Sequence, residues 1–224
     1  LLVSVNRGLV CEVGQDGCAG THAEVGGNPS GLACDSQGRI WIAQGGLAHG
    51  SRSLRIVRPG IQCIEDGQIR DATQATLNAP NDLCFGPDGR LWFTDPRGPA
   101  MTGTSQPGQI YALDTANGAL QCMADDLHFP NGLAFGPDGE ALYIAETFTR
   151  RILRFAFTGG ALGPAEVFAA LPMGHPDGLA FDRDGHLHVA ATSADAVIVI
   201  GPDGTVTETL ELEAGTMPTN LCFG

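Results

Sequence analysis

Residues 130–145 read Pro130-Asn131-Gly132-Leu133-Ala134-Phe135-Gly136-Pro137-Asp138-Gly139-Glu140-Ala141-Leu142-Tyr143-Ile144-Ala145. In this stretch one short apolar run is followed by a Gly-Pro-Asp-Gly turn and then by a second apolar run. Asp-Gly between apolar runs predicts a tight hairpin, because glycine accepts the positive φ that these turns need. The stretch therefore predicts two neighbouring antiparallel strands.

The opening of this stretch belongs to a repeat of the form Pro-X-Y-Leu. Its prolines are spaced by 51, 50, 46 and 42 residues, a period that indicates a solenoid, a propeller or another repeat array. The X residue is polar in every copy, although its identity changes. The five copies are Pro29-Ser30-Gly31-Leu32, Pro80-Asn81-Asp82-Leu83, Pro130-Asn131-Gly132-Leu133, Pro176-Asp177-Gly178-Leu179 and Pro218-Thr219-Asn220-Leu221.

The residues between the copies predict further strands. Turns of the same kind recur at Ser36-Gln37-Gly38, Pro87-Asp88-Gly89 and Arg183-Asp184-Gly185. Additional apolar runs, such as residues 152–155 and 197–200, bring the expected count to about four strands in each repeat. Four strands in a unit of this length are typical of a β-propeller blade, so we predict an all-β propeller.

Counting the repeats predicts one domain over residues 1–224. Four blades are complete, from about Pro29 to Met217, and residues 1–28 and 218–224 are expected to be parts of two more. We therefore expect a six-bladed propeller from which both ends are missing. A closed five-bladed ring, in which the two ends share one blade, is the alternative.

Composition excludes some partners. The formal net charge is −13 and basic residues do not cluster, which argues against a nucleic-acid surface. No run of 18 apolar residues occurs, so no membrane partner is expected. Seven cysteines without a CxxC pair predict buried free thiols in a reducing compartment, hence the cytoplasm. A signal peptide and the oligomeric state stay open.

The X positions are the candidate site. In a propeller the first strand of each blade lines the central channel, and X lies at the start of that strand. We therefore expect the five X side chains to gather at one end of the channel. The loop after each second strand opens on the same face, and the longest, residues 96–107, is a candidate lid that contains Arg97 and Gly98–Gly103.

The chain resembles the SMP-30/gluconolactonase/LRE-like family over essentially its whole length. The resemblance implies a six-bladed propeller that binds one divalent cation, usually Ca²⁺, at the top of the channel. Many members hydrolyse lactones or related esters. The motifs that carry it are Pro80-Asn81-Asp82 with Leu91-Trp92-Phe93-Thr94-Asp95, Pro130-Asn131-Gly132-Leu133 with Tyr143-Ile144-Ala145-Glu146-Thr147, and Pro176-Asp177-Gly178.

The resemblance also implies roles for single residues. Asn131 and Asp177 match two protein ligands of the metal, and Asn81 matches a residue that contacts substrate or a metal-bound water. Asp82 matches an acidic position near the metal. The third main ligand of the family, a Glu at the X position of the first blade, has no counterpart here. Sugar-lactone members carry Arg where this chain has Ala79, which favours a less hydroxylated lactone.

These residue types suit a metal-dependent hydrolysis. Carboxylate and amide oxygens prefer Ca²⁺, with Mg²⁺, Mn²⁺ and Zn²⁺ as alternatives. The cation would polarise the carbonyl of a lactone or ester, and Asp177 or Asp82 would activate the attacking water. The sequence does not choose between these two carboxylates. The predicted metal ligands are Asn131, Asp177 and Asn81, and the predicted substrate contacts are Asn81, Arg97, His175 and Thr147.

Two other function classes remain alternatives at this point. The first is a non-catalytic binding propeller of the NHL type, whose repeats carry similar Pro-x-Gly-Leu signals. The second is a non-hydrolytic propeller enzyme of the strictosidine-synthase-like type, since a fold does not determine a reaction. The chain has no Gly-x-Ser-x-Gly motif, which disfavours a covalent serine mechanism.

Overall fold

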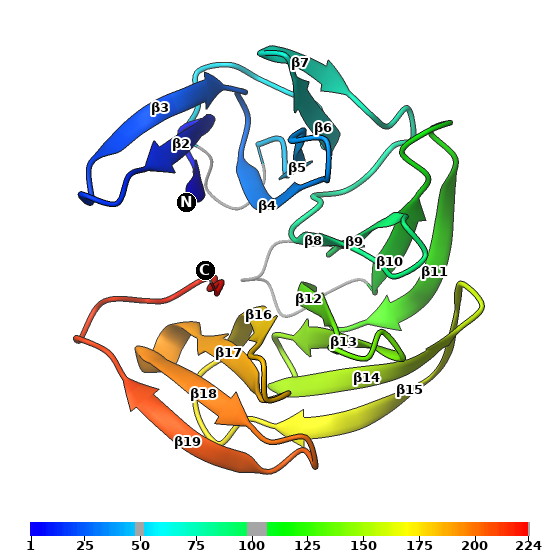
Figure 1. Cartoon of the computed structure of the whole chain (residues 1–224), viewed down its shortest axis with the longest axis vertical. Coiled ribbons are helices and arrows are strands. Elements are labelled where there is room, and N and C mark those ends of the chain that lie inside the picture. Colours follow the sequence, from blue (N-terminus) through cyan, green and yellow to red (C-terminus); the bar gives the residue numbers. More distant parts are fainter. Residues whose placement is uncertain (48–51, 98–106, 224) are drawn as a thin grey trace.

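Five β-sheets follow one another around a common axis in the computed structural model (Figure 1). The structure describes residues 1–47, 52–97 and 107–223. Within these ranges the single helical element is the short 3₁₀ turn η1 (Thr192–Ala194), and none is long and apolar enough to cross a bilayer. The arrangement confirms the prediction of an all-β propeller, with five sheets where six blades were expected.

Four of the sheets have four strands each, which confirms the predicted blade. In each of them the strands pair in chain order and run antiparallel, so the first strand lies innermost (Figure 1). Their bounds are β4 (Pro29–Cys34), β5 (Ile40–Gln44), β6 (Gly60–Glu65), β7 (Gln68–Asp71); β8 (Leu83–Phe85), β9 (Leu91–Asp95), β10 (Gly108–Leu113), β11 (Leu120–Leu127); β12 (Pro130–Phe135), β13 (Ala141–Glu146), β14 (Arg151–Thr158), β15 (Ala161–Ala170); β16 (Pro176–Phe181), β17 (Leu187–Ala191), β18 (Ala196–Ile200) and β19 (Val206–Glu211).

The two ends of the chain are less regular. The first sheet has three strands, β1 (Leu2–Val5), β2 (Leu9–Val13) and β3 (Ala19–Glu24). An opening strand was expected over residues 218–224, but residues 218–223 form no strand, because they find no neighbouring strand to pair with among the described residues. The segment still lies where an inner strand would. Gly178 N donates to Thr219 O (2.9 Å), just as Gly31 N donates to Asn81 O (2.7 Å) between earlier blades.

The hairpin turns form as the Asp-Gly signals predict. At Pro137-Asp138-Gly139 the Asp138 carboxylate accepts a hydrogen bond from Glu140 N (2.9 Å), and Gly139 has a φ of 72°. The equivalent turns place Gly38, Gly89 and Gly185 at φ values of 78°, 77° and 82°. These turns set the register of each inner hairpin and therefore the position of X at its far end.

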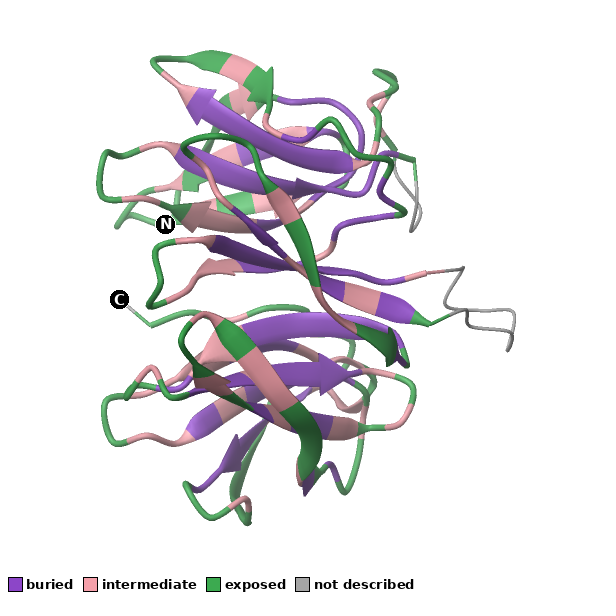
Figure 2. Cartoon of the chain, turned by 90° about the vertical axis from the view of Figure 1, so that its right-hand side faces the viewer, coloured by how far each residue is buried: buried purple, intermediate pink, exposed green. Residues whose placement is uncertain are grey.

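Many strand residues are buried (Figure 2), and hydrophobic cores lie between neighbouring sheets. One core joins Trp41 and Ile61 of one sheet to Leu83, Leu91 and Phe93 of the next. Three further cores join the other neighbouring pairs of sheets in the same way. The three middle sheets are covered on both faces by their neighbours, and these contacts hold their inner strands in place around the axis.

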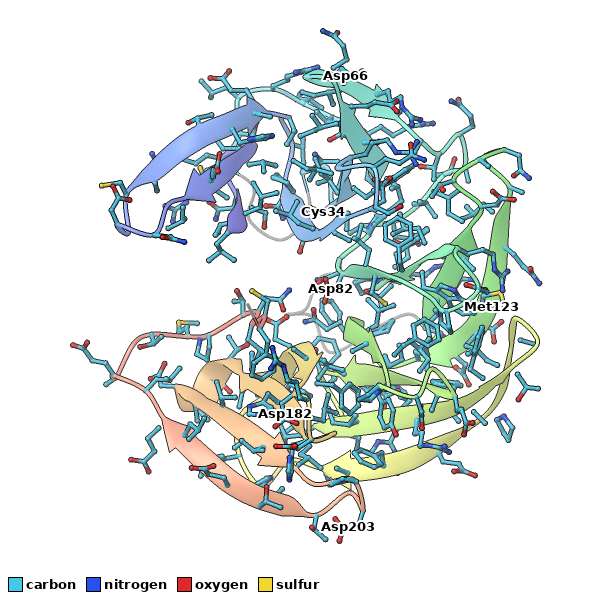
Figure 3. The ribbon with its side chains drawn as sticks, viewed as in Figure 1. Cys34, Asp66, Asp82, Met123, Asp182 and Asp203 are labelled. Carbon is cyan, nitrogen blue, oxygen red and sulfur yellow. The ribbon has the colours of Figure 1, made fainter. Side chains whose placement is uncertain are left out.

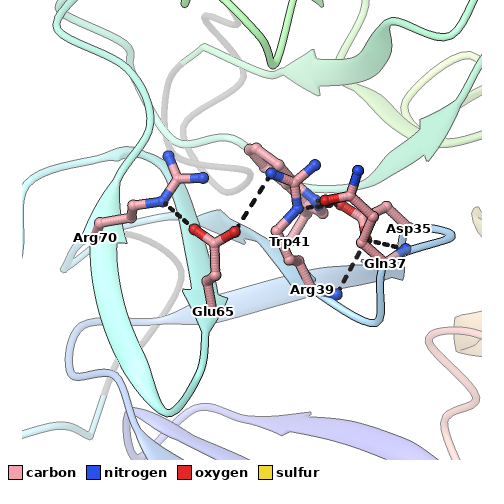
Figure 4. A network of polar contacts seen from close by, with 6 residues as sticks. All are labelled: Asp35, Gln37, Arg39, Trp41, Glu65 and Arg70. Atoms are coloured by element: carbon pink, nitrogen blue, oxygen red, sulfur yellow. Dashed lines mark hydrogen bonds and ion pairs between the residues drawn. The ribbon is translucent and has the colours of Figure 1, made fainter.

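A network of charges lies at the hairpin end of the second sheet (Figure 4). Asp35 accepts hydrogen bonds from Arg39 Nε (2.6 Å) and from Trp41 Nε1 (2.9 Å). Burial raises the pKa of Asp35, but the bonds from Trp41 and Arg39 outweigh it and lower the pKa to about 2. Arg39 and Arg70 both reach Glu65, and both guanidinium groups lie over the Trp41 ring. The network ties this hairpin to the third and fourth strands of its blade.

The cysteines differ from the expectation. All seven are free thiols, but only Cys63 is buried, so the prediction of buried thiols was wrong for Cys18, Cys34, Cys122 and Cys222. Cys34 is the last residue of β4, and Cys222 belongs to the unpaired C-terminal segment. Both line the central cavity, where the ends of the inner strands are not covered by another sheet.

Gly132→Ala is expected to destabilise the fold by about 1–3 kcal/mol through overpacking. A Cβ at this position would lie 2.8 Å from Gly178 Cα and 3.0 Å from Leu179 N, and backbone of the next inner strand cannot move aside alone. Gly20→Ala is the control, because its Cβ would meet nothing within 4 Å. Urea unfolding should separate the two variants. Equal midpoints would show that the inner strands are not closely packed.

Candidate functional site

The X residues of neighbouring blades meet at one end of the channel. Ser30 Oγ lies 3.5 Å from Asn81 Oδ1, and the Asn131 side chain hydrogen-bonds with that of Asp177. Ser30, Asn131 and Asp177 are each the second residue of an inner strand, Asn81 lies two residues before β8, and Thr219 lies in the unpaired C-terminal segment. The structure thus brings together the residues that the repeat singles out.

Asn131 is fixed by two hydrogen bonds, while its side-chain oxygen has no partner among the described residues. The residue is almost fully buried (6% exposed), and its Nδ2 donates to Thr147 Oγ1 (3.2 Å). Its backbone carbonyl accepts from Thr94 Oγ1 of the preceding blade (2.7 Å). Its Oδ1, by contrast, is buried without a hydrogen-bond partner among the described residues. A buried amide oxygen left in this way costs free energy unless a ligand supplies the missing contact.

Asp177 is a carboxylate that its surroundings disfavour as an anion. Burial raises its pKa to about 7; hydrogen bonds from Thr192 and Asn131 oppose the shift, and the charge of Asp82 adds to it. The bond from Thr192 Oγ1 reaches Asp177 Oδ2 (3.1 Å). A nearby cation would lower this pKa again, because it favours the ionised carboxylate. The raised pKa therefore marks a place where a positive charge would be stabilised.

Asp82 directly follows Asn81 and precedes β8, and it lies near the centre of the molecule (Figure 3). Its Oδ1 accepts from Leu83 N (2.9 Å), and hydrogen bonds from Leu133 N and the Asn220 side chain also reach it. Burial raises its pKa to about 6, and these bonds oppose that rise. The Asn220 contact connects the C-terminal segment to the second four-stranded blade.

Asn81 lies beside Ser30 of the preceding blade, and within the described residues its side chain forms no hydrogen bond with Asn131 or Asp177. Its N donates to Thr94 O (3.0 Å) and its O accepts from Gly31 N (2.7 Å), so its backbone is fixed from two blades. Its side chain contacts Ser30. This geometry is compatible with the predicted role as a ligand or substrate contact, which stays a prediction.

The predicted substrate contacts differ in where they lie. Thr147 touches the ring through Asn131. The described contact of Arg97 is with Gln109 on β10 (3.2 Å), and exposed His175 pairs with Ser193 Oγ (2.7 Å). Within the described residues, neither of them forms a hydrogen bond with an X side chain. The predicted lid residues 98–103 lie outside the described residues.

The other buried carboxylates beside the ring have structural partners. Glu146 Oε2 accepts from Arg151 Nη2 (2.7 Å), and its Oε1 accepts from His128 N (2.9 Å). Asp95 accepts from the backbone N of Asn78 and of Ala79 at 2.8–3.1 Å. These groups fasten the segment before each proline, which leaves Asp177 and Asp82 as the carboxylates of the ring.

Sequence reasoning missed Thr94 and Thr192. Both hydroxyls contact an X residue. The Thr94 hydroxyl donates to the backbone carbonyl of Asn131, and the Thr192 hydroxyl donates to the side chain of Asp177. Thr94 lies inside a buried strand, where it looks like an ordinary strand residue. Thr192 carried a usable signal, since it follows the second strand of its blade as Thr147 does.

A cavity of about 930 Å³ runs along the inner strands. Its lining includes Ser30, Asp82 and Thr219 near the X layer and Phe85, Phe135 and Phe181 further along. The volume is in the range of small-molecule sites. Of the predicted site residues Asp82 lines this cavity, whereas Asn81, Asn131 and Asp177 are not part of its lining.

The donor set fits a hard divalent cation. Asn131 Oδ1 lacks a partner in the described part of the chain, and Asp177 and Asp82 supply carboxylates whose charge is uncompensated. Oxygen donors of this kind suit Ca²⁺ or Mg²⁺ better than Zn²⁺. No group of three or more His, Cys, Asp or Glu side chains with metal-binding geometry occurs within the described residues.

Residues 61–224 match the SMP-30/gluconolactonase/LRE-like region. Diisopropyl-fluorophosphatase of Loligo vulgaris is 31% identical over 194 residues, which cover 80% of this chain and 60% of that protein. The chain thus spans less than two thirds of the length of this relative.

Two solved structures are also similar. The gluconolactonase of Xanthomonas campestris is 30% identical with a TM-score of 0.82, and the match covers 99% of this chain and 75% of that one. The calcium-binding protein regucalcin of Agrobacterium tumefaciens is 26% identical with a TM-score of 0.76, covering 96% and 70%. Because the family match covers well over half of the chain and carries the ring residues Asn81, Asn131 and Asp177, this protein belongs to the SMP-30/gluconolactonase/LRE-like family.

Proposed function

We propose that this protein is a metal-dependent hydrolase that opens a lactone or a related ester. The observation that carries the proposal is the buried, unpartnered Oδ1 of Asn131 beside Asp177, whose pKa is raised to about 7. A bound cation would satisfy the first and stabilise the second as an anion. The similarity to a gluconolactonase supports the reaction class.

Asn131, Asp177 and Asn81 are the proposed ligands, with Ca²⁺ as the proposed ion. Carboxylate and amide oxygens are the donors that Ca²⁺ prefers, and the similar regucalcin is described as calcium-binding. When bound, the ion would supply the Lewis acidity that stabilises negative charge on the substrate carbonyl oxygen. The family's additional Glu ligand has no match in this chain.

Asp177 is the proposed general base. A bound cation would keep this buried carboxylate ionised, and an ionised carboxylate can accept a proton from water. It takes a proton from water while the water oxygen bonds to the carbonyl carbon. The ring C–O bond then breaks, and the leaving alkoxide receives that proton from Asp177, which gives a hydroxy acid. Asp82 is less suited because Leu83 N, Leu133 N and Asn220 already occupy its carboxylate.

The proposed substrate is a lactone with few hydroxyl groups. Ala79 takes the place where sugar-lactone members of the family carry Arg, and it is buried with its N bonded to Asp95. This position therefore offers no cation to a sugar hydroxyl. A phosphofluoridate is a second candidate, because a relative 31% identical is named diisopropyl-fluorophosphatase.

A ring of six blades is the proposed complete fold. β1 pairs only with β2, and no described residue pairs with its other edge. Residues 218–223 take the place of a further inner strand, yet they do not pair with β1. Closure into five blades would require that pairing, so these two partial blades are expected to belong to different positions of the ring.

The seven free thiols support the proposed reducing, cytoplasmic compartment.

Chelation should abolish turnover if this proposal holds. The protein in its natural length is assayed with an unsubstituted δ-lactone, gluconolactone and diisopropyl fluorophosphate, before and after EDTA treatment. We expect fastest turnover of the unsubstituted lactone, loss of activity with EDTA and recovery on adding Ca²⁺. Turnover that survives complete metal removal, or none with all three substrates, would contradict the proposal.

A further inference from the structure

Two threonines occupy the same position in neighbouring blades. Thr147 follows the last residue of β13, and Thr192 follows the last residue of β17. Each donates its backbone N–H to the residue before the repeat proline, Phe129 O (3.2 Å) and His175 O (3.1 Å) respectively. The equivalence is therefore structural as well as sequential.

Both hydroxyls contact the X side chain of their own blade. Thr147 Oγ1 lies 3.2 Å from Asn131 Nδ2, and Thr192 Oγ1 lies 3.1 Å from Asp177 Oδ2. The first and second four-stranded blades carry Gly45 and Pro96 at this position, which have no side-chain hydroxyl. Within the four complete blades, the hydroxyl accompanies the two X residues with the strongest case as metal ligands.

The hydrogen bonds of Thr147 have only one consistent direction. Its hydroxyl has a single proton, and Pro176 O, 2.9 Å away, can only accept. The hydroxyl oxygen must then accept from Asn131, so the NH₂ group of that amide faces Thr147. The Asn131 oxygen consequently points away from Thr147 and stays without a protein partner among the described residues.

The opposite amide orientation would be unfavourable. Turned over, Asn131 would set its oxygen against the Thr147 oxygen, whose proton is committed to Pro176. It would also withdraw the hydrogen bond that its side chain makes with the Asp177 carboxylate. Both losses leave acceptors facing acceptors in a buried place, which is costly.

Thr192 orients Asp177, the proposed ligand of the neighbouring blade, by donating a hydrogen bond to it. A carboxylate only accepts, so the Thr192 hydroxyl donates to Asp177 Oδ2 and restricts rotation of that group. We infer that Thr147 and Thr192 are positioning residues that orient the Asn131 amide oxygen and the Asp177 carboxylate for a divalent cation. The inference rests on the proposed metal site and deepens it.

Calcium affinity is the direct measurement. In the protein at its natural length, Thr147→Val and Thr192→Val remove a hydroxyl with little change in shape, and isothermal titration with Ca²⁺ gives the Kd. We expect each to weaken binding by roughly 10- to 100-fold, as loss of an outer-shell partner does. Thr147→Ser and Thr192→Ser keep the hydroxyl and should stay close to wild type. Thr149→Val is the matched control, because that hydroxyl of the same loop contacts Glu146 instead.

The outcomes separate this inference from the proposed function. Wild type that binds Ca²⁺ while both Val variants bind equally well would overturn the positioning role and leave the hydrolase proposal standing. Equal weakening by Ser and Val, or by Thr149→Val, would also overturn it, since packing would then be the cause. Wild type that binds no divalent ion would overturn both proposals. If a Val variant fails to fold by circular dichroism, the Ala variant at that position removes the same hydroxyl.

Discussion

Asp177→Asn is expected to lower kcat/KM for lactone hydrolysis by roughly 10²- to 10⁴-fold, the usual contribution of a positioned base. Asn keeps the shape of the side chain and an oxygen that can accept from Thr192. It cannot take a proton from water, and it removes the negative charge that would balance a cation. The measurement is steady-state kinetics at saturating Ca²⁺, so that weaker ion binding does not hide the loss of the base.

Two controls sharpen this result. Asp203→Asn changes a carboxylate in the hairpin turn at the outer rim, where Asp203 contacts Thr205, and should leave kinetics unchanged (Figure 3). Asp82→Asn should reduce activity less than Asp177→Asn, because the Asp82 carboxylate is already occupied by protein donors. If Asp82→Asn were the more damaging change, the base would have to be reassigned to Asp82. Near-wild-type turnover by Asp177→Asn would remove Asp177 from the mechanism.

Trp92→Ala is expected to destabilise the fold by about 3–5 kcal/mol, the range for deleting a large buried aromatic side chain. Trp92 is fully buried on β9 and contacts two rings of the next blade. Its centroid lies 5.5 Å from that of Phe135 and 5.6 Å from that of Phe157, both edge to face. Its Nε1 donates to Asp88 Oδ1 (3.1 Å), and Arg90 lies over the ring. The substitution therefore removes contacts between two blades and the hydrogen bond that Trp92 gives to Asp88 in the hairpin turn.

Urea unfolding of three variants tests this account. Trp92→Phe keeps a ring but loses the bond to Asp88, so it should cost less than Trp92→Ala. Val206→Ala on the exposed outer strand β19 should stay within about 0.5 kcal/mol of wild type. A loss at Trp92→Ala no larger than that of Val206→Ala would mean that the interface between these blades contributes little to stability.

Much of the blade architecture was predictable from local pattern. A proline, a small apolar run and an Asp-Gly turn each act within a few residues, so the hairpin Pro130–Glu146 could be predicted without its neighbours. The prediction of a strand over residues 218–224 was wrong for the described residues 218–223, for the complementary reason. A strand needs a partner, and its sequence does not say whether one is present.

The candidate site divides in the same way. The five X positions follow from repeat spacing, since equal positions in equal blades must fall on one circle. Arg97 and His175 were proposed from their place in the chain, yet their described contacts are with Gln109 and Ser193. Side-chain direction at a loop depends on the local turn, which spacing alone does not specify.

By itself the sequence determined the repeat, the inner hairpins and which polar residues would share a ring, because these depend on short-range chain geometry. Only the tertiary structure decided which hydrogen bonds the ring residues form. Thr192 on Asp177, Thr147 between Asn131 and Pro176, and Asn220 on Asp82 join elements from different strands or blades. Hydrogen-bond direction and burial arise when those elements pack together, and they leave the side-chain oxygen of Asn131 without a partner among the described residues.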